Sequence, residues 1–235
     1  MGTVKRFEQQ VKKRALLRIL EHVHNAGMAS ADPSYVLYDF LPSGNGYKVR
    51  LTLKYLGLPY ELVQVDILKG ASRTPEFLAR NPIGRIPTLR LPDGTFLAES
   101  HAIIWYLAES SVLVPASRLE RARVLSWLSF EQYELEPNIG TVRLWVSMLH
   151  KKDAELGEKL TEKREKGNRA LGVLDEGLEG KPFLVGSKFS LADISLYAYT
   201  HVAGEGGFDL GKYPNVTAWM KRVAAQPNHA PITSK

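Results

Sequence analysis

The spacing of apolar positions divides the chain into a mixed first part and a helical second part. Short apolar runs rich in β-formers predict strands at residues 35–40, 60–66, 87–91 and 95–98. Apolar residues at helical spacing predict helices at residues 47–57, 74–78 and 102–108. The turn signal Pro92-Asp93-Gly94 joins the last two strands as a hairpin. Strands alternating with helices predict a small α/β domain over residues 35–110.

No strand is predicted after Val114-Pro115. Residues 117–149 carry a long helical pattern that Pro137 must kink or break, because proline lacks the backbone N–H that a helix interior needs. Further helices are predicted at residues 152–178, 190–204 and 214–225. The segment 190–204 is apolar on all sides, which indicates a buried helix. Residues 117–235 are therefore predicted to form an all-α domain.

The buried helix is expected to begin at a capping box. Ser190 and Asp193 have the Ser-x-x-Asp spacing in which each side chain satisfies a free backbone N–H of the first turn. Phe189 and Ile194 flank the box at the positions of a hydrophobic staple. This motif predicts a role in folding and none in chemistry.

Residues 1–34 differ from the rest and predict a basic amphipathic extension. Their apolar side chains fall on one helical stripe, and most of the lysines and arginines lie off it. One interpretation is an upstream extension, with Met28 as the biological start. The other is a helix that docks onto a membrane surface or another protein.

Composition narrows the functional classes for this chain of 235 residues. It contains no cysteine, which excludes disulfides and thiolate metal sites. The net charge of +6 is spread diffusely, which favours a small anionic ligand over nucleic acid. No apolar run is long enough to span a bilayer, so no membrane span is expected. His101, His150 and His201 lack metal-ligand spacing, so no metal is predicted.

The segment 81–89 carries the most informative chemistry. It contains an Ile86-Pro87 bond, and Glu99-Ser100 follows at the start of a predicted helix. A bend at Ile86 would present its N–H and C=O outward, where a peptide could pair with them as an added strand. The helix N-terminus would attract a carboxylate. Together these features predict a small peptide ligand.

At these residues the chain resembles the glutathione transferase family. The similarity continues upstream through residues 35–50 and downstream through 190–194, and it covers about residues 35 to 226. It resembles the cysteine-free bacterial members, of theta- or nu-like type. The resemblance implies a thioredoxin-like first domain, glutathione as cosubstrate, a homodimer and a cytoplasmic location. Without cysteine, the chain cannot form the mixed disulfide that some members form with glutathione.

The resemblance also implies residue roles for holding glutathione. Ile86 would pair with the cysteinyl unit through its backbone, and Pro87 would be cis. Ser100 would contact the γ-glutamyl carboxylate, and Glu99 would hold the γ-glutamyl ammonium. Arg85 would meet the glycyl carboxylate.

Two residues compete for contact with the glutathione sulfur. Ser43 occupies the family's hydroxyl-bearing position after the first strand, and the Asn45 amide can also donate to a thiolate. Such a donor, together with the N-terminus of a helix, would lower the pKa of the thiol and supply the nucleophile. Both are therefore candidate catalytic residues.

The second substrate is expected in a cleft between the domains. Candidate lining residues are Phe40, Leu41, Tyr133, Asn138, Arg143 and Trp145. The leading hypothesis is a glutathione transferase that acts on a hydrophobic electrophile. Asn45 suggests a glutathione-dependent disulfide oxidoreductase as the first alternative. A non-enzymatic glutathione- or ligand-binding protein is the second, because fold does not guarantee activity.

Overall fold

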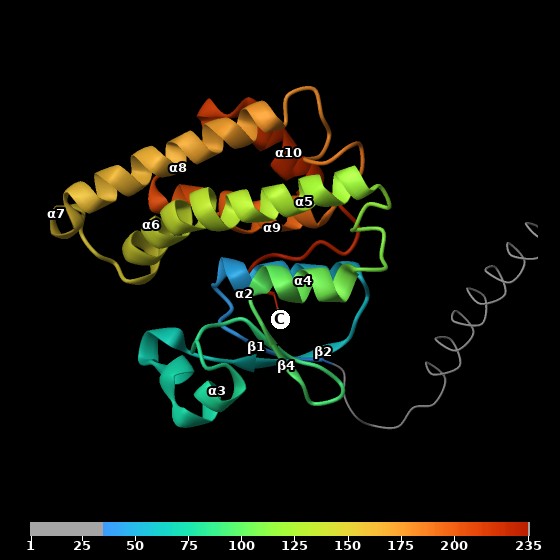
Figure 1. Cartoon of the computed structure of the whole chain (residues 1–235). Helices are drawn as coiled ribbons and strands as arrows, with labels where there is room; N and C mark the ends of the chain where they lie inside the picture. The colour runs from blue at the N-terminus through green and yellow to red at the C-terminus, as the bar shows by residue number, and fades with distance from the viewer. Residues whose placement is uncertain (1–34, 235) are drawn as a thin grey trace, which may run out of the picture. The chain divides into compact units, whose positions relative to one another are not determined.

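The computed structural model describes residues 35–234 (Figure 1). The four predicted strands are present as β1 (Tyr35–Asp39), β2 (Tyr60–Gln64), β3 (Thr88–Arg90) and β4 (Phe96–Ala98). They form one sheet in the order β2-β1-β3-β4, in which β1 is parallel to β2 and antiparallel to β3. β3 and β4 pair as the predicted hairpin. The helix predicted within residues 1–34 lies outside the described residues.

Three helices of the first domain cover the two faces of this sheet. Figure 1 shows α2 (Gly44–Tyr55) and α4 (Ser100–Ala108) between the sheet and the later helices, with α3 (Pro75–Arg80) on the opposite side. Leu37 lies in register with Leu62 on one neighbouring strand and with Leu89 on the other. Leu37 and Leu89 are completely buried, so the centre of the sheet is part of the core.

The second domain contains only helices among its described residues. They are α5 (Arg118–Phe130), α6 (Thr141–Arg143), α7 (Asp153–Leu156), α8 (Glu158–Gly177), α9 (Leu191–Thr200) and α10 (Pro214–Ala224). Short 3₁₀ turns occur in the first domain at Ile67–Lys69 and Ala71–Arg73, and in the second domain at Ala203–Gly206 and Leu210–Lys212. The predicted fold class, a thioredoxin-like α/β domain followed by an all-α domain, is confirmed. No helix in the range 35–234 combines the length and the apolar character that crossing a bilayer requires.

The helix around Gly157 differs from the prediction, and of the two outcomes predicted for Pro137 a break does not occur. Pro137 does not end the helix: it lies in a π-helical segment, η3 (Glu131–Gly140), that continues α5. A second π-helical segment, η4 (Leu144–Met148), follows α6. The predicted helix 152–178 is instead divided into α7 and α8 at Gly157, which has φ 50° and ψ −134°. That conformation suits glycine, because a side chain there would be strained.

The C-terminal segment is fastened to α2 by buried polar side chains. The Tyr47 hydroxyl donates to the Ala230 carbonyl at 2.6 Å. The Arg50 guanidinium donates to the carbonyls of Ile232 (2.6 Å) and Ser234 (2.9 Å). Arg50 also forms a buried ion pair with Asp39, with 2.9 Å between Nε and Oδ2. The end of the chain therefore contributes to the packing of the first domain.

α9 is buried along its whole length and begins at the predicted capping box, which is confirmed. Asp193 accepts from the Ser190 backbone N–H at 2.9 Å. Its other oxygen accepts from the Leu184 N–H (3.0 Å) and from the Trp219 indole N–H (2.9 Å). One carboxylate therefore joins the start of α9 to the preceding loop and to α10.

Replacing Asp193 by alanine should destabilise the protein without altering its site. Three buried N–H donors would lose their acceptor, and each buried unsatisfied group costs about 1–3 kcal/mol. We expect the melting temperature to fall clearly, while the kinetics of the surviving folded protein stay unchanged. Thermal unfolding with activity measured below the transition checks this. An unchanged melting temperature would contradict the assigned role.

Candidate functional site

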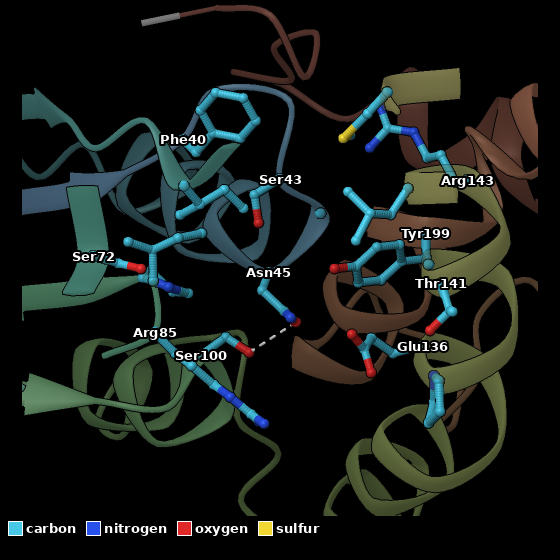
Figure 2. A pocket seen from close by; sticks show the side chains of 18 of the residues that line it. Phe40, Ser43, Asn45, Ser72, Arg85, Ser100, Glu136, Thr141, Arg143 and Tyr199 are labelled. Atoms are coloured by element: carbon cyan, nitrogen blue, oxygen red, sulfur yellow. Dashed lines mark hydrogen bonds between the residues drawn. The ribbon is translucent and has the colours of Figure 1, made fainter. Parts of the chain in front are cut away.

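A cavity of about 660 Å³ lies between the first domain and the helices of the second (Figure 2). Its first wall is formed by the N-termini of α2 and α4 and by the loop before β3. Its second wall is formed by η3, α6, α8 and α9. Predicted site residues that line it are Phe40, Ser43, Asn45, Arg85, Ile86, Pro87, Glu99, Ser100 and Arg143.

The N-terminus of α2 lies on the wall of this cavity. Ser43 is the N-cap residue, and its Oγ accepts from the Gly46 N–H at 3.3 Å. Two positions in this turn accept only glycine, because side chains of neighbouring elements lie very close to the backbone there. A Cβ at Gly46 would lie 1.7 Å from a carboxylate oxygen of Asp39, and one at Gly44 would lie 2.7 Å from the Tyr199 ring. The helix start can therefore pack between the sheet and α9.

Asn45 lies in the first turn of α2, with its amide oxygen fully engaged. Oδ1 accepts from the Lys48 ammonium at 2.9 Å and from the Ser100 hydroxyl at 3.3 Å. Figure 2 shows the amide in the cavity between Ser100 and Tyr199. Its Nδ2 has no acceptor among the described residues, so its two protons remain available to a ligand.

The loop before β3 presents its backbone to the same cavity. The Ile86-Pro87 bond is cis, as predicted. Within residues 35–234, neither the N–H nor the C=O of Ile86 pairs with another backbone group. Asn81 holds the loop in place by donating from Nδ2 to the Arg85 carbonyl (2.8 Å) and to the Thr88 hydroxyl (3.1 Å). A peptide could therefore pair with Ile86 without displacing a protein group.

Glu99 and Ser100 lie where α4 begins. Ser100 is buried and forms the first residue of the helix, beside Asn45. Glu99 has φ 69°, a left-handed conformation that costs a non-glycine residue about 1–3 kcal/mol. Such strain concentrates at ligand sites, and here the exposed Glu99 carboxylate lies on the cavity wall.

Basic side chains predominate around the mouth of the cavity. Four basic residues, Arg73, Arg85, Arg143 and Lys163, line it together with two acidic residues, Glu99 and Glu136. Burial and the neighbouring Glu131 raise the pKa of Glu136, against the lowering effect of Lys48, Arg85 and Lys163. This charge distribution suits an anionic ligand.

Tyr199, which the sequence pattern did not single out, contributes a hydroxyl to the second wall. It projects from α9 toward Ser43 and Asn45 (Figure 2). Burial raises its pKa well above the usual range, so the hydroxyl stays protonated and can donate. Because residues 190–204 were predicted to be buried throughout, the polar end of this tyrosine was not assigned to a site.

Four predicted lining residues do not line this cavity: Leu41, Tyr133, Asn138 and Trp145. Tyr133 is 80% exposed on a different surface. Asn138 is buried, and its Nδ2 donates to the Glu134 carbonyl at 2.6 Å. Both lie in η3, whose cavity-lining residues are Gln132, Glu136, Pro137 and Gly140.

Comparisons with known proteins identify the family of the chain. Residues 42–110 match the glutathione S-transferase N-terminal domain, and residues 141–227 match the glutathione S-transferase C-terminal domain. The chain therefore belongs to the glutathione S-transferase family. Among solved structures, it is 46% identical to a glutathione S-transferase from Pseudomonas fluorescens, with a TM-score of 0.84 over 86% of this chain and all of that one.

Two further relatives carry more specific descriptions. The disulfide-bond oxidoreductase YfcG of Escherichia coli is 32% identical over 195 residues, which cover 80% of this chain and 89% of that protein. The glutathione transferase URE2P8 of Phanerochaete chrysosporium, solved with oxidized glutathione, is 27% identical with a TM-score of 0.75. That match covers 85% of this chain and 93% of the other.

Alanine substitutions should rank the two candidate donors to sulfur. A hydrogen bond to a charged group contributes about 1.5–3 kcal/mol, so Asn45→Ala should lower kcat with glutathione by about 10- to 100-fold. Ser43→Ala should lower turnover more than substrate affinity, and it should also lower stability by about 1 kcal/mol through the lost cap. Steady-state kinetics and the absorbance of bound thiolate check this. If neither variant changed turnover or thiolate, both assignments would fail.

Proposed function

We propose that this protein is a glutathione transferase that activates the glutathione thiol for attack on a hydrophobic electrophile. The observation that carries the proposal is that one cavity contains a free peptide edge at Ile86, the N-termini of α2 and α4, and several basic side chains. Glutathione is a tripeptide with two carboxylates, one ammonium and one thiol, and we assign each group a partner there.

In this arrangement the γ-glutamyl end lies at the N-terminus of α4. Ser100 and the helix dipole receive its carboxylate, and Glu99 receives its ammonium. The cysteinyl backbone pairs with Ile86, and the glycyl carboxylate meets Arg85. The sulfur then lies at the start of α2, near Ser43 and Asn45.

The proposed reaction depends on stabilising the negative charge of the glutathione thiolate. A free thiol has a pKa near 8.5, so donors and the positive end of α2 increase the thiolate fraction at neutral pH. The thiolate attacks an electrophilic carbon, a C–S bond forms, and the leaving group departs with the displaced electron pair. The protein supplies proximity and electrostatics, while the nucleophile belongs to the cosubstrate.

A second candidate function is glutathione-dependent disulfide reduction. Asn45 favours it, because its Nδ2 has no acceptor among the described residues, and so does the similarity to a disulfide-bond oxidoreductase. Since the chain contains no cysteine, such a reaction would use two glutathione molecules as the dithiol. The reaction would still require the same thiolate.

Calorimetry and two assays separate these functions. We expect glutathione to bind, and Ser100→Ala to weaken binding by about tenfold, the effect of a lost hydrogen bond to a charged group. The exposed Ser126 provides a matched control in Ser126→Ala. An aromatic chloride and a small glutathione-free disulfide then serve as alternative substrates.

Turnover of the chloride supports conjugation, and turnover of the disulfide alone supports reduction. Binding without either activity would favour the non-enzymatic alternative. Absence of glutathione binding would overturn the proposal. The expected cytoplasmic location stays a prediction, consistent with the compartment in which glutathione is kept reduced.

We also infer a homodimer that pairs through α4 and α5. A second cavity of about 680 Å³ lies there, and it is largely apolar. Three large side chains at this surface are exposed: Tyr106 (50%), Leu125 (48%) and Tyr133 (80%). Such a cluster is typical of an interface, and a second copy of this chain is the occupant that the family resemblance implies.

Leu125→Lys should therefore convert the dimer into a monomer, because it would bury an unpaired charge. Light scattering after gel filtration measures the mass. Val173→Lys on α8 is the matched control, since Val173 is equally exposed (48%) but lies away from this surface. If the wild type were a monomer, or if both variants remained dimeric, the assigned interface would be wrong.

A further inference from the structure

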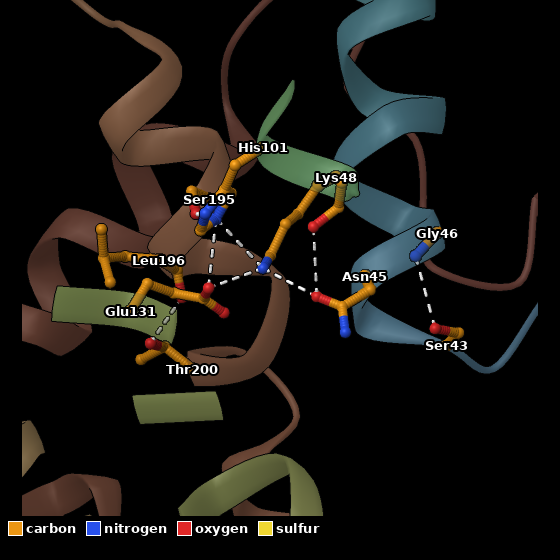
Figure 3. Close-up of polar contacts among 10 residues, drawn as sticks. Ser43, Asn45, Gly46, Lys48, His101, Glu131, Ser195, Leu196 and Thr200 are labelled. Carbon is orange, nitrogen blue, oxygen red and sulfur yellow. Dashed lines mark hydrogen bonds and ion pairs between the residues drawn. The ribbon is translucent and has the colours of Figure 1, made fainter. Parts of the chain in front are cut away.

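A group of charged side chains is buried directly behind the cavity. Lys48 on α2 and Glu131 at the start of η3 have no exposed side-chain surface, and 2.7 Å separates Nζ from Oε2. Figure 3 shows that the ammonium lies among Asn45, Glu131 and His101. None of these contacts is required by the proposed ways of binding glutathione, so the group needs a separate explanation.

The Lys48 ammonium has a polar neighbour on each of three sides. It donates to Glu131 Oε2 (2.7 Å) and to Asn45 Oδ1 (2.9 Å), and it lies 3.3 Å from His101 Nε2. Burial raises the pKa of Glu131, but the charge of Lys48 and the contacts with His101 lower it by more. The pKa of Glu131 is therefore below its usual value. Glu131 is therefore ionised and can neutralise the buried lysine.

Lys48 determines which way the Asn45 amide faces. An ammonium group can only donate, so the amide atom beside it must be the oxygen. The reversed amide would place an NH₂ group against the ammonium, whereas the Ser100 hydroxyl can pair with either atom of the amide. Oδ1 is therefore held at the back of the cavity, and Nδ2 is left without a protein acceptor.

The other candidate donor, Ser43, is placed differently. Its Oγ accepts from the Gly46 N–H and so caps α2. No buried group fixes the direction of its hydroxyl proton among the described residues. Of the two, only the Asn45 donor is oriented in advance by the fold, and pre-oriented donors stabilise charge without reorganisation.

We propose that Lys48, neutralised by Glu131, is a positioning residue that fixes the Asn45 amide with Nδ2 toward the cavity and thereby makes Asn45 the main donor to the glutathione sulfur. The inference rests on the proposed function and deepens it. Lys48 acts through Asn45 and does not touch glutathione. Its effect should appear in the ionisation of the bound thiol.

The test is the pKa of the thiol of bound glutathione, measured from thiolate absorbance against pH. The double variant Lys48→Met/Glu131→Leu removes both charges together. The net charge beside the sulfur is then unchanged, and an apolar pair of similar volume can replace a buried ion pair without loss of stability. Any change in the thiol pKa would then come from the released amide.

We expect this double variant to raise the thiol pKa by about one unit, the effect of a weakened hydrogen bond to a charged group. Asn45→Ala should raise it as much, and adding Asn45→Ala to the double variant should have little further effect. This non-additivity identifies residues that act as a unit. Lys54→Met removes a lysine from the last turn of the same helix and should leave the thiol pKa unchanged.

An unchanged thiol pKa in a folded, glutathione-binding double variant would overturn the inference. So would effects of Lys48→Met/Glu131→Leu and Asn45→Ala that simply add. If the double variant fails to fold, a crystal structure of the wild type with glutathione decides. The sulfur should lie within hydrogen-bonding distance of Asn45 Nδ2 while Oδ1 stays on Lys48, and a sulfur bound by Ser43 alone would overturn the inference.

A different experimental result would overturn the proposed function. If the wild type does not bind glutathione in calorimetry, both the proposed function and this inference are overturned. If it binds glutathione and catalyses turnover while the variants keep the wild-type thiol pKa, only this inference is lost.

Discussion

The ion pair between Lys48 and Glu131 is the interaction on which the geometry of the site depends. Each residue comes from a different domain, and each is removed from water. A buried charge without its partner costs about 3–5 kcal/mol, so neither α2 nor η3 can move independently. These two elements form opposite walls of the cavity. This ion pair therefore fixes the distance between the two walls, and with it the space available to a ligand.

The remaining features of the site are also held in place before any ligand arrives. Asn81 holds the loop before β3 by hydrogen bonds to Ile83 and Arg85 in the loop and to Thr88 at the start of β3. Ser43 closes the first turn of α2, and Ser100 connects the starts of α2 and α4 through Asn45. Because these donors and helix ends are fixed by the fold, little further ordering is needed when charge develops on a ligand. This suits a reaction in which the ligand brings its own nucleophile.

The sequence predicted those parts of the molecule that depend on local patterns. The strands, the hairpin turn and the Ser190–Asp193 cap are all encoded within a few residues, and all are present. Placement within η3 was not predictable, because packing against the first domain decides which face of this segment meets the cavity. Gln132, Glu136 and Gly140 line it, whereas Tyr133 and Asn138 do not. Lys48 was missed because a lysine on a helix is ordinarily solvated, and its partner lies 83 residues away. Tyr199 was missed because its surroundings are apolar.

The attachment of the last residues to α2 bears on how the chain folds during synthesis. Arg50 is buried in the first domain, yet two of its hydrogen-bond acceptors are carbonyls of Ile232 and Ser234. A domain ordinarily folds as a unit once its own residues have emerged from the ribosome. Here the Arg50 guanidinium lacks two of its acceptors until residues 232–234 have been synthesised. The final packing of the first domain is therefore expected to follow the synthesis of the second domain.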